Sequence, residues 1–568
     1  MILIRNKFAL FLFLFLINFT FAQNDAFIQL ASRGEVYLKF KPSSQPIPES
    51  VLNAISIDHG YHSEWITAYA NESGFLKLRQ YTNDIEILTP PSLIYKPEMK
   101  SAEEIKSISD WDFYPTYEAY VDIMYQFAED HPNLCSVFSI GQTEEGRELL
   151  IARISDNAGI DESEAQFLYT STMHGDETTG YVLMLHLIDY LLTNYGSNAQ
   201  VTNIVDNLDI WINPLANPDG TYFGGNSTVY GSKRYNANNV DLNRNFADPD
   251  DGPHPDGNAY QAETEAFMAI AEENHFVIAA NFHGGAEVFN YPWDTWSQLH
   301  ADDEWWQFVG REWADTAHVY SPAGYMNDLE NGITNGYAWY TTTGSRQDYM
   351  NYYHHCREVT LEISSVKLVQ ESALPDFWDY NYHSFLNYME QALFGIRGQV
   401  TDEQTGDPVQ ASVVIEGHDE LNTWVVSGKD DGWYFRPIFE GEYELTFFAP
   451  HYEPKVIAGV EAINYLETAL NVALKPTDSD IEENKLENLF VVGPNPVKDK
   501  LSLKYNGSVP LNTQIVLINL SGKILWKDHH IWNTNNKEAS IPINLRAGEY
   551  ILNIIGEQSC ATFKIIQP

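Results

Sequence analysis

Apolar runs typical of buried strands alternate with helical patterns over the middle half of the chain. The runs at 208–213 and 276–282 are mostly apolar, which is typical of strands buried on both faces of a sheet. Residues 117–129 and 181–195 carry apolar positions at helical spacing. This alternation predicts an α/β domain with a mixed, largely parallel central sheet flanked by helices. Ligands of such sheets bind beyond the carboxyl ends of the strands, so the residues that follow these runs are the first candidates for chemistry.

The pattern changes on both sides of this α/β domain, which we place at 111–393. Residues 23–98 combine short strand-like runs with one helix-like stretch, which predicts a small N-terminal domain or a propeptide. Residues 394–476 and 488–568 contain short strands separated by turn residues, which predicts two small all-β sandwich domains. A polar linker at 475–484 joins them.

The first 22 residues have the layout of a cleaved signal peptide. A basic start is followed by an apolar run at 8–19 and by Ala22 at a cleavage position. This run is too short to span a bilayer comfortably, and no later segment is long and apolar enough to do so. We therefore expect an exported protein without a transmembrane segment.

Charge and cysteine content narrow the possible partners. The 568 residues carry a formal net charge of −46, which argues against nucleic-acid binding because a phosphate backbone attracts Lys and Arg. Three cysteines exclude a scaffold dense in disulfides. Two arrangements stay open for them: a Cys135–Cys356 disulfide that leaves Cys560 over, or two buried free thiols.

A metal site is indicated by His174 and Glu177, an H-x-x-E pair that directly follows a strand-like run. Gly175 between them permits a tight turn, and His283 follows the run at 276–282. Two imidazoles and one carboxylate are a ligand set for catalytic zinc, which keeps a fourth position open for water. The sequence predicts one zinc ion held by these three residues.

Further polar residues predict hydrolysis at this metal. Glu362 interrupts an apolar strand-like run, where burial is expected to raise its pKa into the range of a general base. Arg244 can hold a carboxylate with its planar fork, with Asn243 donating beside it. Arg234 can polarise a carbonyl group that is about to be attacked.

These motifs resemble those of zinc metallocarboxypeptidases of the carboxypeptidase A superfamily, in particular the branch that contains carboxypeptidases D, E, M and N. The resemblance covers roughly 111–393. The matching stretches are His174-Gly-Asp-Glu, Asn217-Pro-Asp-Gly, Arg234 with Asn236-Ala-Asn-Asn-Val-Asp-Leu-Asn-Arg-Asn-Phe, Asn281-Phe-His-Gly-Gly, Asn290-Tyr-Pro-Trp-Asp, Gly332-Ile-Thr-Asn-Gly and Thr360-Leu-Glu-Ile-Ser.

The resemblance implies a role for each residue of the site. The three ligand residues would bind zinc, Glu362 would activate the zinc-bound water and then protonate the leaving amine, and Arg234 would stabilise the oxyanion. Asn243 and Arg244 would hold the terminal carboxylate of the substrate, which implies an exopeptidase that acts on peptides or proteins with a free C-terminus. Asp241 would orient a zinc histidine.

Two substrate contacts are also implied by the resemblance. The branch places a mobile tyrosine in a Gln-Asp-aromatic-Asn-Tyr motif, and this chain has Gln347-Asp-Tyr-Met-Asn-Tyr-Tyr. A gapless match puts Asn351 at that position, whereas a shift by one residue puts Tyr352 there; we favour Tyr352, with Tyr353 as the alternative. Asp294 lies in the motif where the branch places an acid that recognises basic residues, which predicts a preference for C-terminal Arg or Lys.

The two β-rich modules resemble known companion domains. Residues 394–476 resemble the transthyretin-like domain that follows the catalytic domain in this branch. Residues 488–568 resemble the sorting domain of type IX secretion, on the motifs Val492-Gly-Pro-Asn-Pro, Leu517-Ile-Asn-Leu-Ser-Gly-Lys and Leu545-Arg-Ala-Gly-Glu-Tyr. The type IX secretion machinery is therefore an expected partner, with release or cell-surface attachment after passage across the outer membrane.

Two other functions remain as alternatives. One is an amidase or deacylase of the same fold that acts on peptidoglycan peptides. Arg244 and Asn243 argue against this alternative, because they favour a substrate with a free α-carboxylate. The other is a catalytically inactive protein that binds surface material, and the complete ligand set with Glu362 argues against that. The expected function is a secreted zinc carboxypeptidase.

Overall fold

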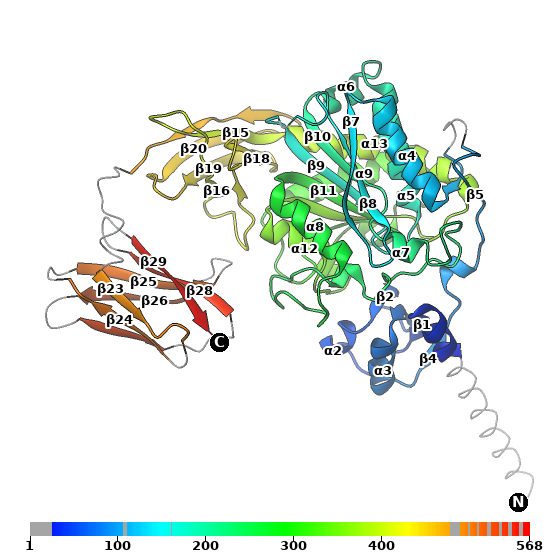
Figure 1. Cartoon of the computed structure of the whole chain (residues 1–568), viewed down its shortest axis with the longest axis horizontal. Coiled ribbons are helices and arrows are strands. Elements are labelled where there is room, and N and C mark those ends of the chain that lie inside the picture. The colour runs from blue at the N-terminus through cyan, green and yellow to red at the C-terminus, as the bar shows by residue number, and fades with distance from the viewer. Residues whose placement is uncertain are drawn as a thin grey trace, which may run out of the picture. The chain divides into compact units, whose positions relative to one another are not determined.

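The computed structural model describes most of the chain (Figure 1). The predicted signal peptide, most of the linker at 475–484 and the beginning of the motif at 545–550 lie outside the described residues. Contact density divides the chain into two compact units, Met1–Ala449 with Pro454–Leu474 and Pro450–Glu453 with Lys475–Pro568. The described residues are 25–105, 111–160, 162–477, 489–497, 500–507, 511–519, 524–532, 537–542, 548–555 and 560–567.

The central domain is built on one sheet of eight strands. They are β7 (Cys135–Gln142), β8 (Glu148–Ile154), β9 (Ala165–Ser171), β10 (Leu208–Asn213), β11 (Phe276–His283), β12 (Glu287–Tyr291), β13 (Ile333–Asn335) and β14 (Arg357–Ile363). The order is β13-β12-β14-β11-β9-β10-β8-β7. The inner run from β14 to β10 and the β12–β13 pair are parallel, and the other three pairs are antiparallel. The prediction of a mixed, largely parallel sheet is confirmed.

Helices cover both faces of this sheet. Successive side chains of a strand point to opposite faces, so Phe167 and Tyr169 of β9 enter a large core while Leu168 enters a second one. The first core is closed by α4, α5, α9 and α13, and the second by α8 and α12. The helices are α4 (Tyr117–Asp130), α5 (Thr179–Asn194), α6 (Ala199–Val205), α7 (Pro218–Thr221), α8 (Ala262–Glu273), α9 (Asp303–Tyr320), α10 (Asp328–Asn331), α11 (Gly336–Trp339), α12 (Arg346–Tyr353) and α13 (Leu374–Glu390), with 3-10 turns η2 (Leu242–Arg244), η3 (Glu371–Ala373) and η4 (Gln391–Leu393).

The residues before the central domain fold around a core of their own. An antiparallel sheet has the order β2-β3-β1-β4, and its apolar side chains pack with those of the helices as a separate cluster. Residues 25–33 are also helical. The elements are β1 (Val36–Phe40), α2 (Glu49–Leu52), β2 (Ser56–His59), β3 (Ile66–Ala70), α3 (Glu72–Tyr81), β4 (Ile85–Ile87) and η1 (Pro91–Leu93), followed by β5 (Met99–Lys100), which pairs with β6 (Tyr114–Pro115).

Two small sheets follow the central domain and form a sandwich. They contain β15 (Gly395–Asp402), β16 (Ser412–Ile415), β17 (Val425–Val426), β18 (Trp433–Arg436), β19 (Gly441–Phe448), β20 (Lys455–Ala462), β21 (Glu467–Ala469) and β22 (Val472–Leu474). A buried ion cluster joins this sandwich to the central domain. Asp302 lies 2.7 Å from Arg357 of the sheet and 2.7 Å from Arg436 of the sandwich. Breaking such a buried network typically costs about 3–5 kcal/mol, so the sandwich is a fixed part of this unit.

The second unit is also all-β. Its strands are β23 (Phe490–Gly493), β24 (Lys500–Tyr505), β25 (Leu511–Asn519), β26 (Ile524–Trp532), β27 (Glu538–Pro542), β28 (Gly548–Ile555) and β29 (Cys560–Gln567). They form sheets of order β23-β24-β27 and β26-β25-β28-β29 around a common core.

The structure shows the state of two cysteines and tests each described helix as a possible membrane span. Cys135 and Cys356 are both buried free thiols, so of the two arrangements left open the structure has the unpaired one. Burial raises the pKa of Cys135 to about 12, which keeps this thiol protonated and unreactive. Among the described helices, none combines the length and the apolar content that crossing a bilayer requires.

Candidate active site

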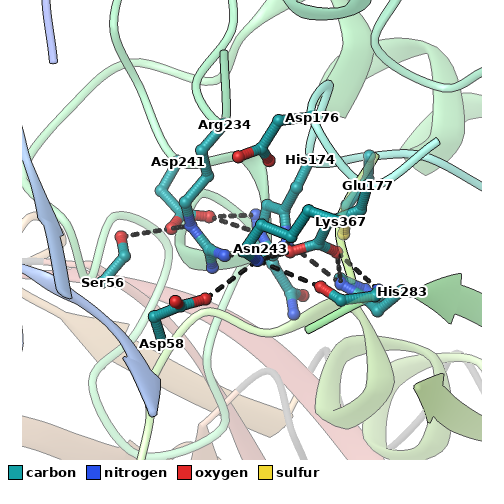
Figure 2. A network of polar contacts seen from close by, with 12 residues as sticks. Ser56, Asp58, His174, Asp176, Glu177, Arg234, Asp241, Asn243, His283 and Lys367 are labelled. Carbon is teal, nitrogen blue, oxygen red and sulfur yellow. Dashed lines mark hydrogen bonds and ion pairs between the residues drawn. The ribbon is translucent and has the colours of Figure 1, made fainter. Parts of the chain in front are cut away.

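Three predicted metal ligands converge where β9 and β11 end (Figure 2). His174 and Glu177 lie in the turn between β9 and α5, and His283 is the last residue of β11. Nδ1 of His174 lies 3.0 Å from Nδ1 of His283, and the Glu177 carboxylate lies 3.0 and 2.9 Å from these two atoms. All three side chains are buried.

This donor set fits a zinc ion. Ligand atoms at about 2.0–2.1 Å around a tetrahedral zinc lie roughly 3.3 Å from one another, close to the separations seen here. The outer ring nitrogen of His174 is held as a metal-bound histidine requires, against a carboxylate oxygen that can accept its proton. Nε2 of His174 lies 3.1 Å from Asp241, and Nε2 of His283 lies 2.8 Å from the side-chain amide of Asn281. Burial also lowers the pKa of His283 to about 4, which favours the neutral imidazole that binds metal.

Gly175 is needed in the ligand turn for a different reason from the one expected. Its backbone does not adopt the left-handed conformation that favours glycine. Instead, the turn lies directly against the backbone of α7, and a Cβ atom at this position would come within 2.4 Å of the Gly220 carbonyl carbon. The glycine therefore allows two backbone segments to touch, which seats the ligand turn on the loop that carries Arg234.

Glu362 is placed beside the metal ligands by strand pairing. In the parallel register of β11 and β14, Glu362 lies directly opposite His283. One of its carboxylate oxygens is buried without a hydrogen-bond partner. Burial, reinforced by the negative charge of Glu177, raises the pKa of the Glu362 carboxyl well above its usual range. Such a group suits proton transfer near neutral pH.

The predicted cations and Asn243 come from the loop around η2. Arg234 lies 3.2 Å from Glu177 and 3.0 Å from Asp241. Asp241 also begins η2 by accepting a hydrogen bond from the backbone N–H of Asn243, which fixes Asn243 and Arg244 beside the metal ligands. The Arg244 guanidinium donates to the Asn243 carbonyl at 2.7 Å.

All predicted site residues except Tyr352 line one cavity. They are His174, Glu177, Arg234, Asn243, Arg244, His283, Asp294 and Glu362. Asp294 is buried and receives hydrogen bonds from the side-chain amides of Asn290 and Gln347. Burial raises the pKa of the Asp294 carboxyl, and burial beside Asp294 raises the pKa of the Asp348 carboxyl strongly.

Tyr352 lies on α12 and packs against tryptophans. Its ring centroid is 5.5 Å from that of Trp296 and 6.4 Å from that of Trp293. It is not among the described residues that line the cavity, so a role for Tyr352 in substrate contact stays a prediction. A different tyrosine, Tyr340, lines the cavity and was not singled out by the sequence.

The N-terminal domain reaches the cavity, which sequence reasoning did not foresee. Ile57 and Asp58 of β2 are part of the cavity lining. Asp58 pairs at 2.9 Å with the buried Lys367, whose Nζ lies 2.7 Å from Glu177 (Figure 2). Ser56 donates to Asp241 at 2.5 Å, next to the ligand His174. No local pattern marks these residues, because they meet only through the packing of two domains.

The cavity enclosed by these two domains is small, with a volume of about 40 Å³. A single water occupies about 10–15 Å³ on this measure, so the space holds only a few waters. Hydrogen bonds hold the covering domain in place over a wide area. Arg33 donates to the carbonyls of Gly231 and Ser232, and Tyr69 donates to Asp176 beside the ligand Glu177.

Comparison with known proteins adds to this geometry. The family described as "Zinc carboxypeptidase" matches residues 120–384, and the family described as "Secretion system C-terminal sorting domain" matches residues 491–567. Carboxypeptidase D of Homo sapiens is 35% identical over 381 residues, which are 63% of this chain and 27% of that protein. The chain thus spans little more than a quarter of that relative.

A shorter relative is covered over most of its length. The carboxypeptidase N catalytic chain of Homo sapiens is 34% identical over 378 residues, 60% of this chain and 81% of that one. Among solved structures, carboxypeptidase A from Helicoverpa armigera has a TM-score of 0.49 at 18% identity, over 63% of this chain and 97% of that one. From the identity to the carboxypeptidase N chain over most of its length, together with the buried His-Glu-His group, we conclude that the chain belongs to the zinc carboxypeptidase family.

Proposed function

We propose that this protein is a secreted zinc carboxypeptidase that hydrolyses the C-terminal peptide bond of peptides or proteins. The observation that carries the proposal is the shared cavity. It brings a buried His-Glu-His donor set together with the free carboxyl of Glu362 and with Arg234, Asn243 and Arg244. A metal hydrolase needs the metal donor set and an acid–base group such as Glu362. Recognition of a terminal carboxylate needs hydrogen-bond donors such as Asn243 and Arg244.

Each residue has a defined task in the reaction. When bound, zinc polarises the scissile carbonyl and lowers the pKa of water. Glu362 takes the proton of the attacking water and delivers it to the leaving amine. Arg234 donates to the oxygen on which negative charge develops. Asn243 and Arg244 hold the terminal carboxylate, so that the last peptide bond lies over Glu362.

Chelation and end-blocking test this function. Zinc-loaded protein is expected to release single amino acids from the C-terminus of peptides, to lose this activity with a chelator and to regain it with zinc. Peptides that are identical but carry a C-terminal amide should react far more slowly, because Arg244 loses its charged partner. Mass spectrometry of the products measures both. Equal rates on acids and amides would contradict an exopeptidase and favour the amidase alternative.

For the residue removed, we propose Arg or Lys, recognised by Asp294. Support comes from its buried position in the cavity wall and from its carboxylate, the natural partner of a cation. Its pKa is raised, so the carboxylate is charged above the raised value and neutral below it. The preference for basic residues should therefore be full at high pH and should fall as pH decreases through that value.

The pH dependence is measured as a ratio of kcat/KM for peptides ending in Arg and in Leu. Titration of Glu362 affects both substrates and cancels in the ratio. We expect the ratio to fall by about tenfold or more as the pH decreases through the raised pKa of Asp294, and to become small and independent of pH in Asp294→Asn. A strong preference for Leu in the wild type would contradict this assignment.

We further propose export through the type IX secretion machinery, after removal of residues 1–22. Support comes from the match of residues 491–567 to a secretion sorting domain. The protein would then act outside the outer membrane, released or attached to the surface.

For the N-terminal domain, we propose the role of a propeptide that covers the site until it is cleaved. Support comes from Ile57 and Asp58, which occupy part of the cavity wall, and from the small volume that remains. The ion pair between Asp58 and Lys367 holds the cover directly over the ligand Glu177.

A further inference from the structure

Two cations touch the ligand Glu177, and their counter-charges come from different domains. Arg234 lies 3.2 Å from Glu177 and pairs at 3.0 Å with Asp241 of the central domain. Lys367 lies 2.7 Å from the same carboxylate and pairs at 2.9 Å with Asp58 of the N-terminal domain (Figure 2). Among the described residues, Glu177 and Asp58 are the acidic groups within ion-pair distance of Lys367. The charge of Arg234 is therefore balanced within the central domain, whereas that of Lys367 is balanced by the covering domain.

Burial makes this balance important for the metal. The side chains of Lys367 and Asp58 are 4% and 2% exposed, and that of Glu177 is 1% exposed. Charges that are withdrawn from water interact several times more strongly than charges in solvent. A buried lysine that touches a metal ligand repels a divalent cation, and a carboxylate paired with that lysine cancels most of the repulsion. Zinc binding at Glu177 therefore depends on whether Lys367 has its counter-charge.

A second contact from the N-terminal domain reaches the ligand His174. Ser56 donates to one oxygen of Asp241, and the other oxygen lies 3.1 Å from Nε2 of His174. Asp241 also accepts hydrogen bonds from two donors of the central domain, so Ser56 adds only a further bond to a carboxylate that is already fixed. The charge of Asp58 is thus the stronger link between the covering domain and the metal ligands.

We infer that the N-terminal domain raises the zinc affinity of the site that it covers, with Asp58 acting as the counter-charge of Lys367. This inference rests on the zinc site of the proposed function and gives the covering domain a second task. While the domain is in place, the ligand Glu177 lies beside a balanced ion pair, in a cavity that holds only a few waters. The cover would then retain the metal as well as exclude the substrate.

The other role open to this ion pair is to keep the cover closed. Both roles predict weaker zinc binding in Asp58→Asn, but they differ for Lys367→Gln. The second change also breaks the ion pair, yet it removes the positive charge and leaves a group that can donate to Glu177. If charge balance matters, Lys367→Gln binds zinc at least as tightly as the wild type. If closure alone matters, it binds zinc as weakly as Asp58→Asn.

The zinc affinity of the intact chain is measured by competition with a chromophoric chelator. Asp58→Asn is expected to weaken zinc binding by about tenfold to 100-fold, the usual effect of changing a group that supports a metal ligand. The double variant, Asp58→Asn with Lys367→Gln, should recover most of this loss, because the pair is again without net charge. Asp84→Asn is the matched control, since Asp84 is an exposed acid of the same domain, and it should leave the affinity unchanged.

Thermal unfolding of the metal-free proteins shows whether each variant is folded. If Asp58→Asn does not fold, Lys367→Gln still decides between the two roles, because they predict opposite changes in its zinc affinity. Unchanged affinity in Asp58→Asn, or equal weakening in both single variants and the double variant, would overturn the inference.

The proposed function is tested separately, because these affinities are measured without turnover. A wild-type chain that binds no zinc would contradict the proposed zinc site itself. Absence of amino-acid release by the zinc-loaded enzyme after removal of the N-terminal domain would contradict carboxypeptidase activity, and it would leave the comparison of zinc affinities valid.

Discussion

Glu362→Gln is expected to reduce kcat by about 10²-fold to 10⁴-fold, the usual contribution of a positioned acid–base group. The amide cannot accept the proton of the attacking water or return one to the leaving amine. Its shape is retained, and Glu362 is not a metal ligand, so zinc content and peptide affinity should stay close to those of the wild type. Turnover, metal analysis and calorimetry on the same preparation measure the three quantities.

Two comparisons make this result specific. Glu330→Gln removes an exposed carboxylate of α10 and should leave turnover unchanged. The pH profile of kcat/KM in the wild type should also rise as Glu362 loses its proton, at a pH above the ordinary range of a glutamate. A Glu362→Gln protein that keeps a tenth or more of wild-type turnover would show that another group moves the proton.

Cleavage of the segment that follows the N-terminal domain is expected to raise activity by about 100-fold. Residues 102–104 are exposed and can carry an engineered protease site. Opening the cover must separate Asp58 from the buried Lys367, and breaking a buried pair costs about 3–5 kcal/mol. A cost of about 3 kcal/mol leaves less than roughly 1% of molecules open at any time. Amino-acid release is measured before cleavage and again after separation of the two fragments.

Two controls test whether the gain in activity comes from cleavage at the engineered site and whether the Asp58–Lys367 ion pair holds the cover in place. The unmodified chain, treated with the same protease, should show no comparable gain. Asp58→Ala in the intact chain should give part of the increase, because Lys367 then loses its ion-pair partner in the covering domain. If the intact chain is as active as the separated enzyme, the N-terminal domain is not an inhibitory propeptide.

The central fold follows closely from local patterns. The run at 208–213 coincides with β10 (Leu208–Asn213), and the run at 276–282 falls within β11 (Phe276–His283). These strands are buried on both faces, which is why they are apolar nearly throughout and easy to recognise. The metal-binding residues could also be predicted from the sequence, because His174 and His283 lie at the ends of such strands, where parallel sheets bind their substrates and cofactors.

Contacts between segments that are distant in the chain could not be predicted from local sequence patterns. The sequence could not show that Asp58 meets Lys367, since the two belong to different domains and neither follows a repeating pattern. It directed attention to the Gln347 motif for the substrate tyrosine, whereas the cavity contains Tyr340 from the loop before α12. Loop side chains are positioned by neighbouring elements, so their direction cannot be obtained from periodicity.

By itself, the sequence determined the α/β class and the His-Glu-His donor set for zinc. These features depend on burial patterns and on short spacings within one strand or turn. Only the tertiary structure decided which other polar residues share the cavity with them: Tyr340 in its lining, Lys367 paired with Glu177, and Asp58 paired with Lys367. The physical reason is that these contacts form when a domain interface and two loops close around the ends of the sheet, at sequence separations over which local preferences carry no information.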